Sequence, residues 1–339
     1  MIDSRSSRLF LTSAVAVSLV VCWTGAARAS DHADTQILVS AGRHDGRITD
    51  LFAFTRGDNL VLILCLNPTV PAQTFVYDFA TDLTVKIAID NNSLVTFSDV
   101  DDLNKYGGTV ANPAGILEDI VLEITFDSQN QPTVVTMGLP PGAENDIEIF
   151  TGLRDDPFIR GPVTGKNVAA IVLEFPLEHV LAGQETLLIW GTSAIDGMAG
   201  DFQEMVGRSL RSQLSENLFM NSLHPSEHEA HLGVPPDVMI YDTSRPASFP
   251  NGRELTDDVI DLVGDPRLLT TDGCPGTAPP TCVPSPSAND RPFEAEFPYL
   301  AQPHLPPGIP TVSAWGIVVL TLTMLIIAQL YFGRRQQIA

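Results

Sequence analysis

The sequence predicts a mainly β fold: an antiparallel β-sandwich or barrel-like ectodomain with one or two helical insertions and a single C-terminal transmembrane helix. Three observations carry this prediction. Short apolar runs alternate with Gly, Pro and Asn turn residues, the N-terminus has the features of an export signal, and a long uncharged run lies near the C-terminus. The predicted divisions are a signal peptide (1–29), an ectodomain (30–270), a Pro-rich segment partly packed on it (271–308), and a sorting motif, membrane helix and basic end (309–335).

The N-terminus predicts a secretory signal peptide, with signal peptidase as a processing partner. Two arginines precede an apolar run from Leu9 to Val21, which is short for a membrane span. Ala27 and Ala29 place small residues at the −3 and −1 positions of a cleavage site, so we expect the mature chain to begin at Ser30. An uncleaved N-terminal anchor is the alternative.

Composition excludes some partners. The 339 residues include 41 acidic and 19 basic ones, for a formal charge of −22. This balance excludes nucleic acid and electrostatic docking on anionic lipid, since both need a basic face. It fits an exported domain kept soluble by its charge.

The middle of the chain reads as short strands. Thr84–Ile89, for example, alternates with period two and ends at an Asp-Asn-Asn turn. Similar apolar runs predict strands at 50–54, 59–66, 120–126, 133–137, 147–150, 167–175 and 186–192. Helices are expected at 176–182 and 201–223, and 255–263 is ambiguous.

The cysteines and the C-terminal run concern the end of the chain. Cys274 and Cys282 flank a Pro-rich loop, so a disulfide between them is expected in an oxidising compartment, whereas Cys65 is interpreted as a buried apolar filler. About twenty uncharged residues from Ser313 to Phe332 match the length of a membrane helix. The arginines that follow favour the cytoplasmic side, which places the ectodomain in the periplasm or at the cell surface.

Histidines and acids suggest a metal site close to the mature N-terminus. The candidate ligands are His32, Asp34 and Asp50, because imidazole and carboxylate groups suit divalent cations such as calcium or zinc. Further candidate ligands, if the fold brings them to the same place, are His44, Asp45 and His304. The alternative is that these side chains cap turns and fix the N-terminal segment through hydrogen bonds.

Three other polar groups have plainer interpretations. The helical spacing of His224, His228 and His231 suits zinc, but a solvated polar connector is favoured because Pro225 and Gly233 limit the helix. The acids in 98–104 fail the EF-hand pattern, which leaves a different calcium site open. The acids in 154–157 and 257–258 are interpreted as caps and loop-fixing ion pairs.

Several blocks together resemble a known exported bacterial family. They are Ser30–Thr35, Ile48–Phe54, Gly152–Phe158, Asn167–Glu174, Phe249–Asp261, Asn289–Phe293, Phe297–Ala301 and Pro303–His304. In this order the set resembles the family called domain of unknown function 4331, over nearly the whole ectodomain. The resemblance implies no activity and no catalytic residues. The chain departs from the family at Met205–Ser209 and in the loop between the two distal cysteines.

The C-terminal tail resembles the short sorting signals called IPTL-CTERM. The matching residues are Ile309, Pro310, Thr311, Ser313, Trp315 and Gly316, followed by the apolar run and two arginines. This resemblance implies a sorting protease as a partner. Ala314 departs from the acidic residue common there, and a plain single-span anchor is the alternative.

The functional prediction is an envelope-anchored binding or surface-display domain without catalysis, whose extracellular ligand the sequence does not identify. We find no nucleophile elbow, phosphate loop or dinucleotide fingerprint in the sequence. The alternatives are a metal-binding protein or metal-dependent enzyme that uses the residues near the mature N-terminus, and a structural surface or matrix component.

Overall fold

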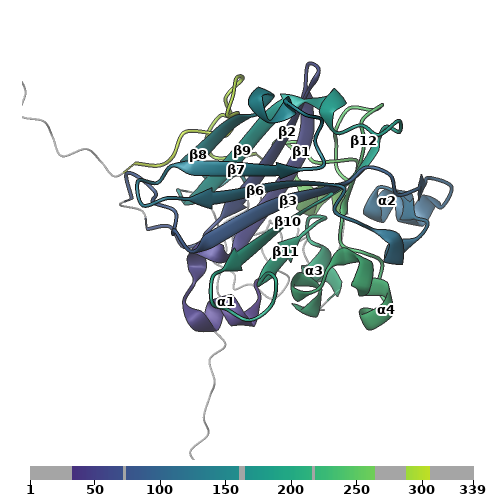
Figure 1. The fold of residues 1–339 in the computed structure, drawn as a ribbon, viewed down its shortest axis with the longest axis horizontal. Helices are drawn as coiled ribbons and strands as arrows, with labels where there is room; N and C mark the ends of the chain where they lie inside the picture. The colour runs from purple at the N-terminus through teal and green to yellow at the C-terminus, as the bar shows by residue number, and fades with distance from the viewer. Residues whose placement is uncertain (1–32, 72–73, 160–164, 216–217, 264–287, 306–339) are drawn as a thin grey trace, which may run out of the picture.

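Two antiparallel sheets stack face to face in the protein (Figure 1). The structure is a computed structural model that describes residues 33–71, 74–159, 165–215, 218–263 and 288–305. One sheet has the strand order β1-β2-β9-β8, formed by β1 (Ile48–Arg56), β2 (Asn59–Leu66), β9 (Asn167–Pro176) and β8 (Glu148–Asp155). We call it sheet A. Every strand pair in it is antiparallel.

The second sheet, sheet B, has the order β11-β10-β3-β6-β7. Its strands are β11 (Glu204–Val206), β10 (Thr186–Ile195), β3 (Leu83–Asp90), β6 (Ile120–Phe126) and β7 (Pro132–Met137). A sixth strand, β12 (Met239–Asp242), pairs with the first half of β10 while β11 pairs with its second half. A small separate sheet joins β4 (Val95–Thr96) to β5 (Thr109–Val110).

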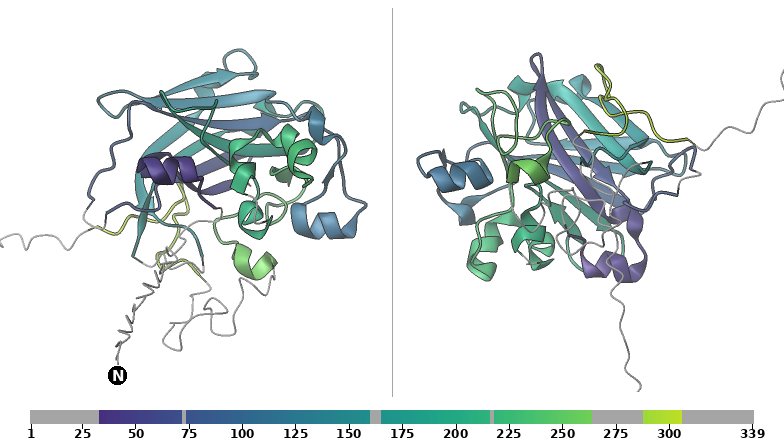
Figure 2. Two further views of the ribbon diagram at one scale, coloured as in Figure 1. Left: turned by 90° about the horizontal axis from the view of Figure 1, so that it is seen from below. Right: turned by 180° about the vertical axis from the view of Figure 1, so that it is seen from behind.

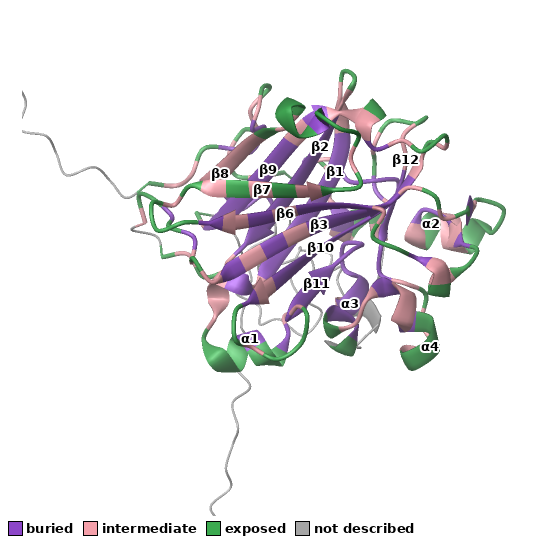
Figure 3. Ribbon diagram, in the orientation of Figure 1, coloured by how far each residue is buried: buried purple, intermediate pink, exposed green. Residues whose placement is uncertain are grey.

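Strand β2 shows why some strands are apolar at every position instead of alternating between apolar and polar residues. Leu60, Leu62 and Leu64 point into the core between the two sheets, whereas Val61 and Ile63 belong to a second cluster on the outer face of sheet A. Successive strand residues face opposite sides, so burial on both sides makes the whole strand apolar. Figure 3 shows the resulting buried interior across both sheets.

The segment 288–305 covers the outer face of sheet A. Tyr299 and Leu300 are buried there against Phe52, Phe54 and their neighbours. Seen from behind, this segment runs across the sheet that contains β1 and β2 (Figure 2). It therefore attaches the C-terminal part of the described chain to the sandwich.

The helices are short and lie outside the sandwich. They are α1 (Gln36–Ala41), α2 (Val100–Tyr106), α3 (Arg211–Ser215), α4 (His228–Leu232) and α5 (Val259–Val263). Single 3-10 turns are η1 (His44–Gly46), η2 (Pro113–Gly115), η3 (Ala143–Asp146), η4 (Leu177–His179), η5 (Leu218–Ser222) and η6 (Pro225–Glu227).

The eight strands expected from the sequence are present, but the helix expected at 201–223 is wrong. That stretch contains β11, α3 and η5, because Glu204–Val206 pairs with β10 before the chain turns at Leu210, where φ is +62°. Of the apolar residues in this stretch, Met205 and Val206 lie on the strand and Leu210 lies in the turn that follows it. Tertiary pairing has overridden the local pattern.

The fold-class prediction also needs correction in its last part, the transmembrane helix. Within the ranges that the structure describes, no helix is long and apolar enough to cross a membrane. The residues assigned to it, 309–335, lie outside those ranges, as do Ala29 and Ser30 of the expected cleavage site and the cysteine pair 274 and 282. Cys65 is buried on the outer face of sheet A, as expected.

Candidate metal centre

The end of strand β8 positions two adjacent acids in the interior. Asp155 is the last residue of β8 and pairs in register with Asn167 of β9, and Asp156 donates its backbone N–H to the carbonyl oxygen of Lys166 at 3.2 Å. Pro157 then ends the ladder because it has no N–H to donate. Both carboxylate-bearing residues are only 1% exposed.

His304 is held over the same strand end by Asn167. The side-chain amide of Asn167 donates to the backbone carbonyl of His304 at 2.7 Å and accepts from its backbone N–H at 2.7 Å. The backbone N–H of Asp155 also donates to the carbonyl of Ala301 at 3.3 Å. These bonds fix the position of the histidine relative to β8 and β9.

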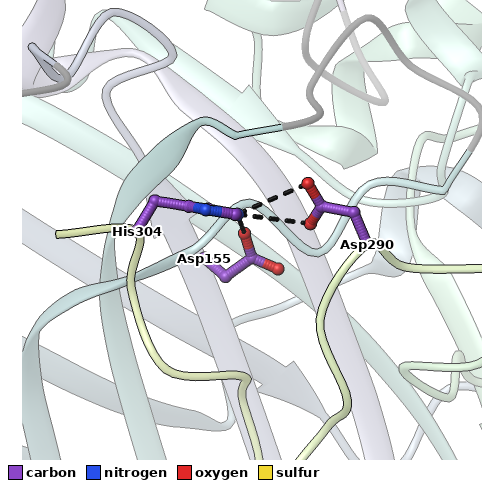
Figure 4. Close-up of side chains that lie close together, drawn as sticks. All are labelled: Asp155, Asp290 and His304. Carbon is purple, nitrogen blue, oxygen red and sulfur yellow. Dashed lines mark hydrogen bonds and ion pairs between the residues drawn. The ribbon is translucent and has the colours of Figure 1, made fainter. Parts of the chain in front are cut away.

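Asp155, Asp290 and His304 converge from three parts of the chain (Figure 4). Nε2 of His304 lies 2.9 Å from Oδ1 of Asp155 and 3.4 Å from each carboxylate oxygen of Asp290. One ligand atom from each residue lies within 4.8 Å of the other two. The three side chains are 0%, 17% and 26% exposed in the order Asp155, Asp290, His304, so the cluster opens to solvent on the histidine side.

Burial makes this cluster costly for negative charge. Desolvation raises the pKa of Asp155 to about 6, opposed by the hydrogen bond from the amide of Asn289 at 2.7 Å. Desolvation likewise raises the pKa of Asp156 to about 7, opposed by the backbone N–H of Phe158. Oδ1 of Asp155 and Oδ2 of Asp156 are buried and accept no hydrogen bond from the part of the chain that the structure describes. Orphaned carboxylate oxygens of this kind are satisfied by a cation.

The hydrogen bonds around His304 indicate which of its two ring nitrogens carries the proton. Arg291 donates from Nε to Nδ1 of His304 at 3.3 Å, so in this arrangement Nδ1 is an acceptor and a neutral ring carries its proton on Nε2. A cation bound at Nε2 requires the proton on Nδ1 instead. Because a protonated Nδ1 cannot accept a hydrogen bond, binding of the cation breaks the hydrogen bond from Arg291 to His304.

The donor set fits a divalent transition metal. One imidazole nitrogen and two carboxylate oxygens suit Zn²⁺ or Mn²⁺ better than Ca²⁺, which prefers oxygen ligands alone. Tetrahedral Zn²⁺ with bonds of about 2.1 Å separates its ligand atoms by about 3.4 Å. The distances of 2.9 and 3.4 Å from Nε2 to the two carboxylates are close to that spacing.

The metal ligands proposed from the sequence lie elsewhere. Asp34 forms a two-pronged ion pair with Arg47, and Asp50 pairs with Arg253 at 2.9 Å. His32 lies outside the described residues. The structure thus places Asp34 and Asp50 in different ion pairs and brings neither to the described three-ligand cluster. The metal prediction for them remains untested by direct observation.

His304 is the one residue common to the sequence hypothesis and the observed cluster. The sequence pattern predicts a loop-fixing role for Asp155 and gives no indication that Asp290 is a ligand. The available signal lay in the family resemblance, since its blocks 152–158, 289–293 and 303–304 supply all three residues. Composition and spacing alone place these blocks too far apart to connect.

The other polar groups have structural roles. His228 is buried, and its Nε2 lies 3.0 Å from the carbonyl of Met220, while Nδ1 accepts from the backbone N–H of Asp237. His224 accepts from the backbone N–H of Ser226. Asp99 caps α2 by accepting from two backbone N–H groups. The three histidines at 224, 228 and 231 are not assembled as a metal cluster in the described chain.

Comparisons with known proteins add little. No protein-family model matches the chain, and no curated protein matches it. Among solved structures, a collagen-binding domain from a Staphylococcus aureus adhesin is similar at 14% identity, over 46% of this chain and 95% of that domain. Its TM-score of 0.16 is too low to support an argument about fold or function.

Proposed function

We propose that the protein is an exported, non-catalytic binding domain that holds a divalent transition-metal ion between Asp155, Asp290 and His304. The export part rests on the signal-like N-terminus and the acidic composition. The resemblance to an exported family without assigned activity supports the same view. The ion fastens the segment 288–305 to the end of β8, and this segment covers sheet A.

The observation that carries the proposal is the buried, unpartnered oxygen of Asp155 beside Nε2 of His304. The two atoms are 2.9 Å apart, but the angles between the groups do not fit a hydrogen bond, so Oδ1 of Asp155 accepts none from His304. An ion pair between protonated His304 and the two acids explains the contact without a metal. The orphaned oxygen favours the metal, because a cation satisfies it without requiring hydrogen-bond geometry.

Calorimetric titration of the purified, metal-free mature protein with Zn²⁺, Mn²⁺ and Ca²⁺ tests the proposal. We expect one Zn²⁺ or Mn²⁺ per chain and weaker binding of Ca²⁺. At a free-ion concentration of 100 times Kd, binding should stabilise the fold by about 2.7 kcal/mol. The Asp290→Asn and His304→Gln variants should lose this binding.

The matched control is His179→Gln. His179 also lies 2.9 Å from a carboxylate, that of Asp146, but this exposed pair belongs to no three-ligand cluster in the described chain. Its replacement should leave zinc binding unchanged. Equal loss in the control and the site variants would show nonspecific histidine binding and contradict the proposal.

A further inference from the structure

Two buried arginines lie apart from the metal cluster, next to strand β11. Arg208 follows β11 and Arg211 is the first residue of α3. They are 6% and 7% exposed, so both guanidinium groups are largely removed from water. Burial of a charged group costs several kcal/mol unless an opposite charge compensates it.

Neither arginine forms an ion pair with a carboxylate of the residues that the structure describes. Nη1 of Arg208 donates to the carbonyl of Ser209 at 3.3 Å, and Nη2 of Arg211 donates to the carbonyl of Pro235 at 3.1 Å. Nε of each is buried without a hydrogen bond. By contrast, the equally buried Arg253 pairs with Asp50.

Aromatic rings hold the two guanidinium groups in place. The ring of Tyr106 lies 5.5 Å from the guanidinium carbon of Arg208 and 5.0 Å from that of Arg211, and Arg208 also lies 4.8 Å from the ring of Phe249. Stacking uses the flat faces of guanidinium groups and leaves their N–H edges for an anion. The aromatic rings therefore fix the two guanidinium groups in position, while some of their N–H donors remain without an acceptor among the described residues.

Among the described residues, the charges that interact with the pair leave an excess of about one positive charge. Asp237 is the acid that interacts with both arginines, and its Oδ1 accepts from the backbone N–H of Arg208 at 2.7 Å. Burial lowers the pKa of His228, which contributes no charge when neutral. Two guanidinium groups and one carboxylate sum to one positive charge, which a monoanion balances and a phosphate dianion exceeds.

We propose that Arg208 and Arg211 bind the carboxylate group of a small organic acid. The paired N–H edges of guanidinium match the two oxygens of a carboxylate. Ser209 lies between the two arginines in sequence, and its buried hydroxyl, which finds no partner among the described residues, is a further donor in the same segment. The site is independent of the metal centre and of the function proposed for it.

Acetate is the probe for this site. Thermal unfolding of the mature protein is followed in sodium acetate and in sodium chloride of equal ionic strength, with sodium phosphate as a third series. We expect acetate to raise Tm with saturation at one site, and chloride and phosphate to have no such effect. A larger effect of phosphate, or an equal effect of chloride, would overturn the proposal.

Two variants locate the effect. Arg211→Lys keeps the positive charge but loses the paired N–H donors of the guanidinium group, and acetate binding should weaken about tenfold. Arg208→Met removes a buried charge for a similar apolar volume, so the ligand-free fold should be no less stable while the acetate response disappears. Retention of the full response in both variants would contradict the assignment.

The control is Arg245→Met. Arg245 also stacks on an aromatic ring, that of Phe97 at 5.2 Å, but it already pairs with Asp242 at 2.8 Å. Its replacement should leave the acetate response unchanged. If the site variants fail to fold, the arginine Nε–Hε signals of the wild-type protein decide by NMR: two should shift with acetate, and no shift would refute the site.

Discussion

Arg253 and Asp50 form an ion pair inside the sandwich, with Nη2 of the arginine 2.9 Å from Oδ1 of the acid and side chains 1% and 0% exposed. The arginine also lies 4.0 Å from the ring of Phe52, and its backbone N–H donates to the carbonyl of Ala53. The pair therefore joins β1 to Arg253, which lies 203 positions further along the chain than Asp50.

Loss of one partner of this pair should be strongly destabilising. Asp50→Asn removes a carboxylate charge 2.9 Å from a buried guanidinium group, and we expect the free energy of unfolding to fall by about 3–5 kcal/mol. Urea unfolding measures the change. Glu123→Gln is the control, because Glu123 pairs with Lys86 at the surface and its loss should cost at most about 1 kcal/mol.

The same variant tests the sequence-based metal hypothesis for Asp50. If Asp50 were a ligand, Asp50→Asn would lower the metal content of the folded protein. We expect the metal content per folded chain to stay unchanged, because the ligands proposed from the structure are Asp155, Asp290 and His304. A loss of metal that follows this substitution alone would contradict that assignment.

The buried acids at the end of β8 should make stability depend on pH. The pKa values of Asp155 and Asp156 are raised to about 6 and about 7, above an unfolded value near 4. Between about pH 4 and 7 the folded state therefore binds more protons than the unfolded state. Stability in the absence of metal should fall as pH rises through this window, by up to about 1.4 kcal/mol per pH unit and group.

Asp156→Asn should remove part of this slope, because the amide is neutral at every pH. Urea unfolding in the presence of a chelator, at intervals from pH 4.5 to 7.5, measures it. Adding Zn²⁺ should stabilise the protein more at pH 7.5 than at pH 4.5, since the ion competes with protons for the ligands. A slope of the opposite sign in the metal-free protein would contradict the burial argument.

Gly207 should resist substitution for a steric reason. A Cβ added there would lie 2.3 Å from the carbonyl oxygen of Asp237 and 2.7 Å from Cα of Val238, both backbone atoms. We expect Gly207→Ala to cost about 1–3 kcal/mol and to weaken the acetate response by displacing Asp237. Gly46→Ala is the matched control, since its Cβ would meet only side-chain atoms of Ile195 and Leu38, at 3.2 Å and beyond.

Processing at the N-terminus is a separate prediction. Cleavage after Ala29 gives a mature protein that begins at Ser30, which the intact mass of protein isolated from its own cell envelope would show. A mass that includes the residues before Ser30 would favour the uncleaved anchor, and a mass that begins at another position would contradict the predicted cleavage site. The measurement does not depend on either proposed binding site.

Sequence patterns predict the positions of the strands, but they do not connect Asp155, Asp290 and His304, which lie in distant parts of the chain. The apolar runs at 59–66 and 167–175 are strands because both faces of sheet A are buried, one by sheet B and the other by residues such as Tyr299. Such two-sided burial leaves a clear local signal. The helix expected at 201–223 failed because β10, a distant strand, recruits residues 204–206.

The metal cluster could not be derived from local patterns. Asp155 and Asp290 are 135 positions apart in sequence, and Asn167 rather than any motif holds His304 against β8. Likewise, that Arg208 forms no side-chain ion pair with a described residue is a property of three-dimensional packing. Near the mature N-terminus, Asp34 pairs with Arg47, 13 positions along the chain, whereas Asp50 pairs with the distant Arg253, a contact that no local pattern indicates.

The most direct test of the metal proposal is anomalous diffraction at the zinc edge from crystals of the mature protein grown with Zn²⁺. The proposal predicts one peak at about 2.0–2.2 Å from Nε2 of His304 and from an oxygen each of Asp155 and Asp290. The absence of a peak there, in crystals that contain zinc elsewhere or none, would contradict it.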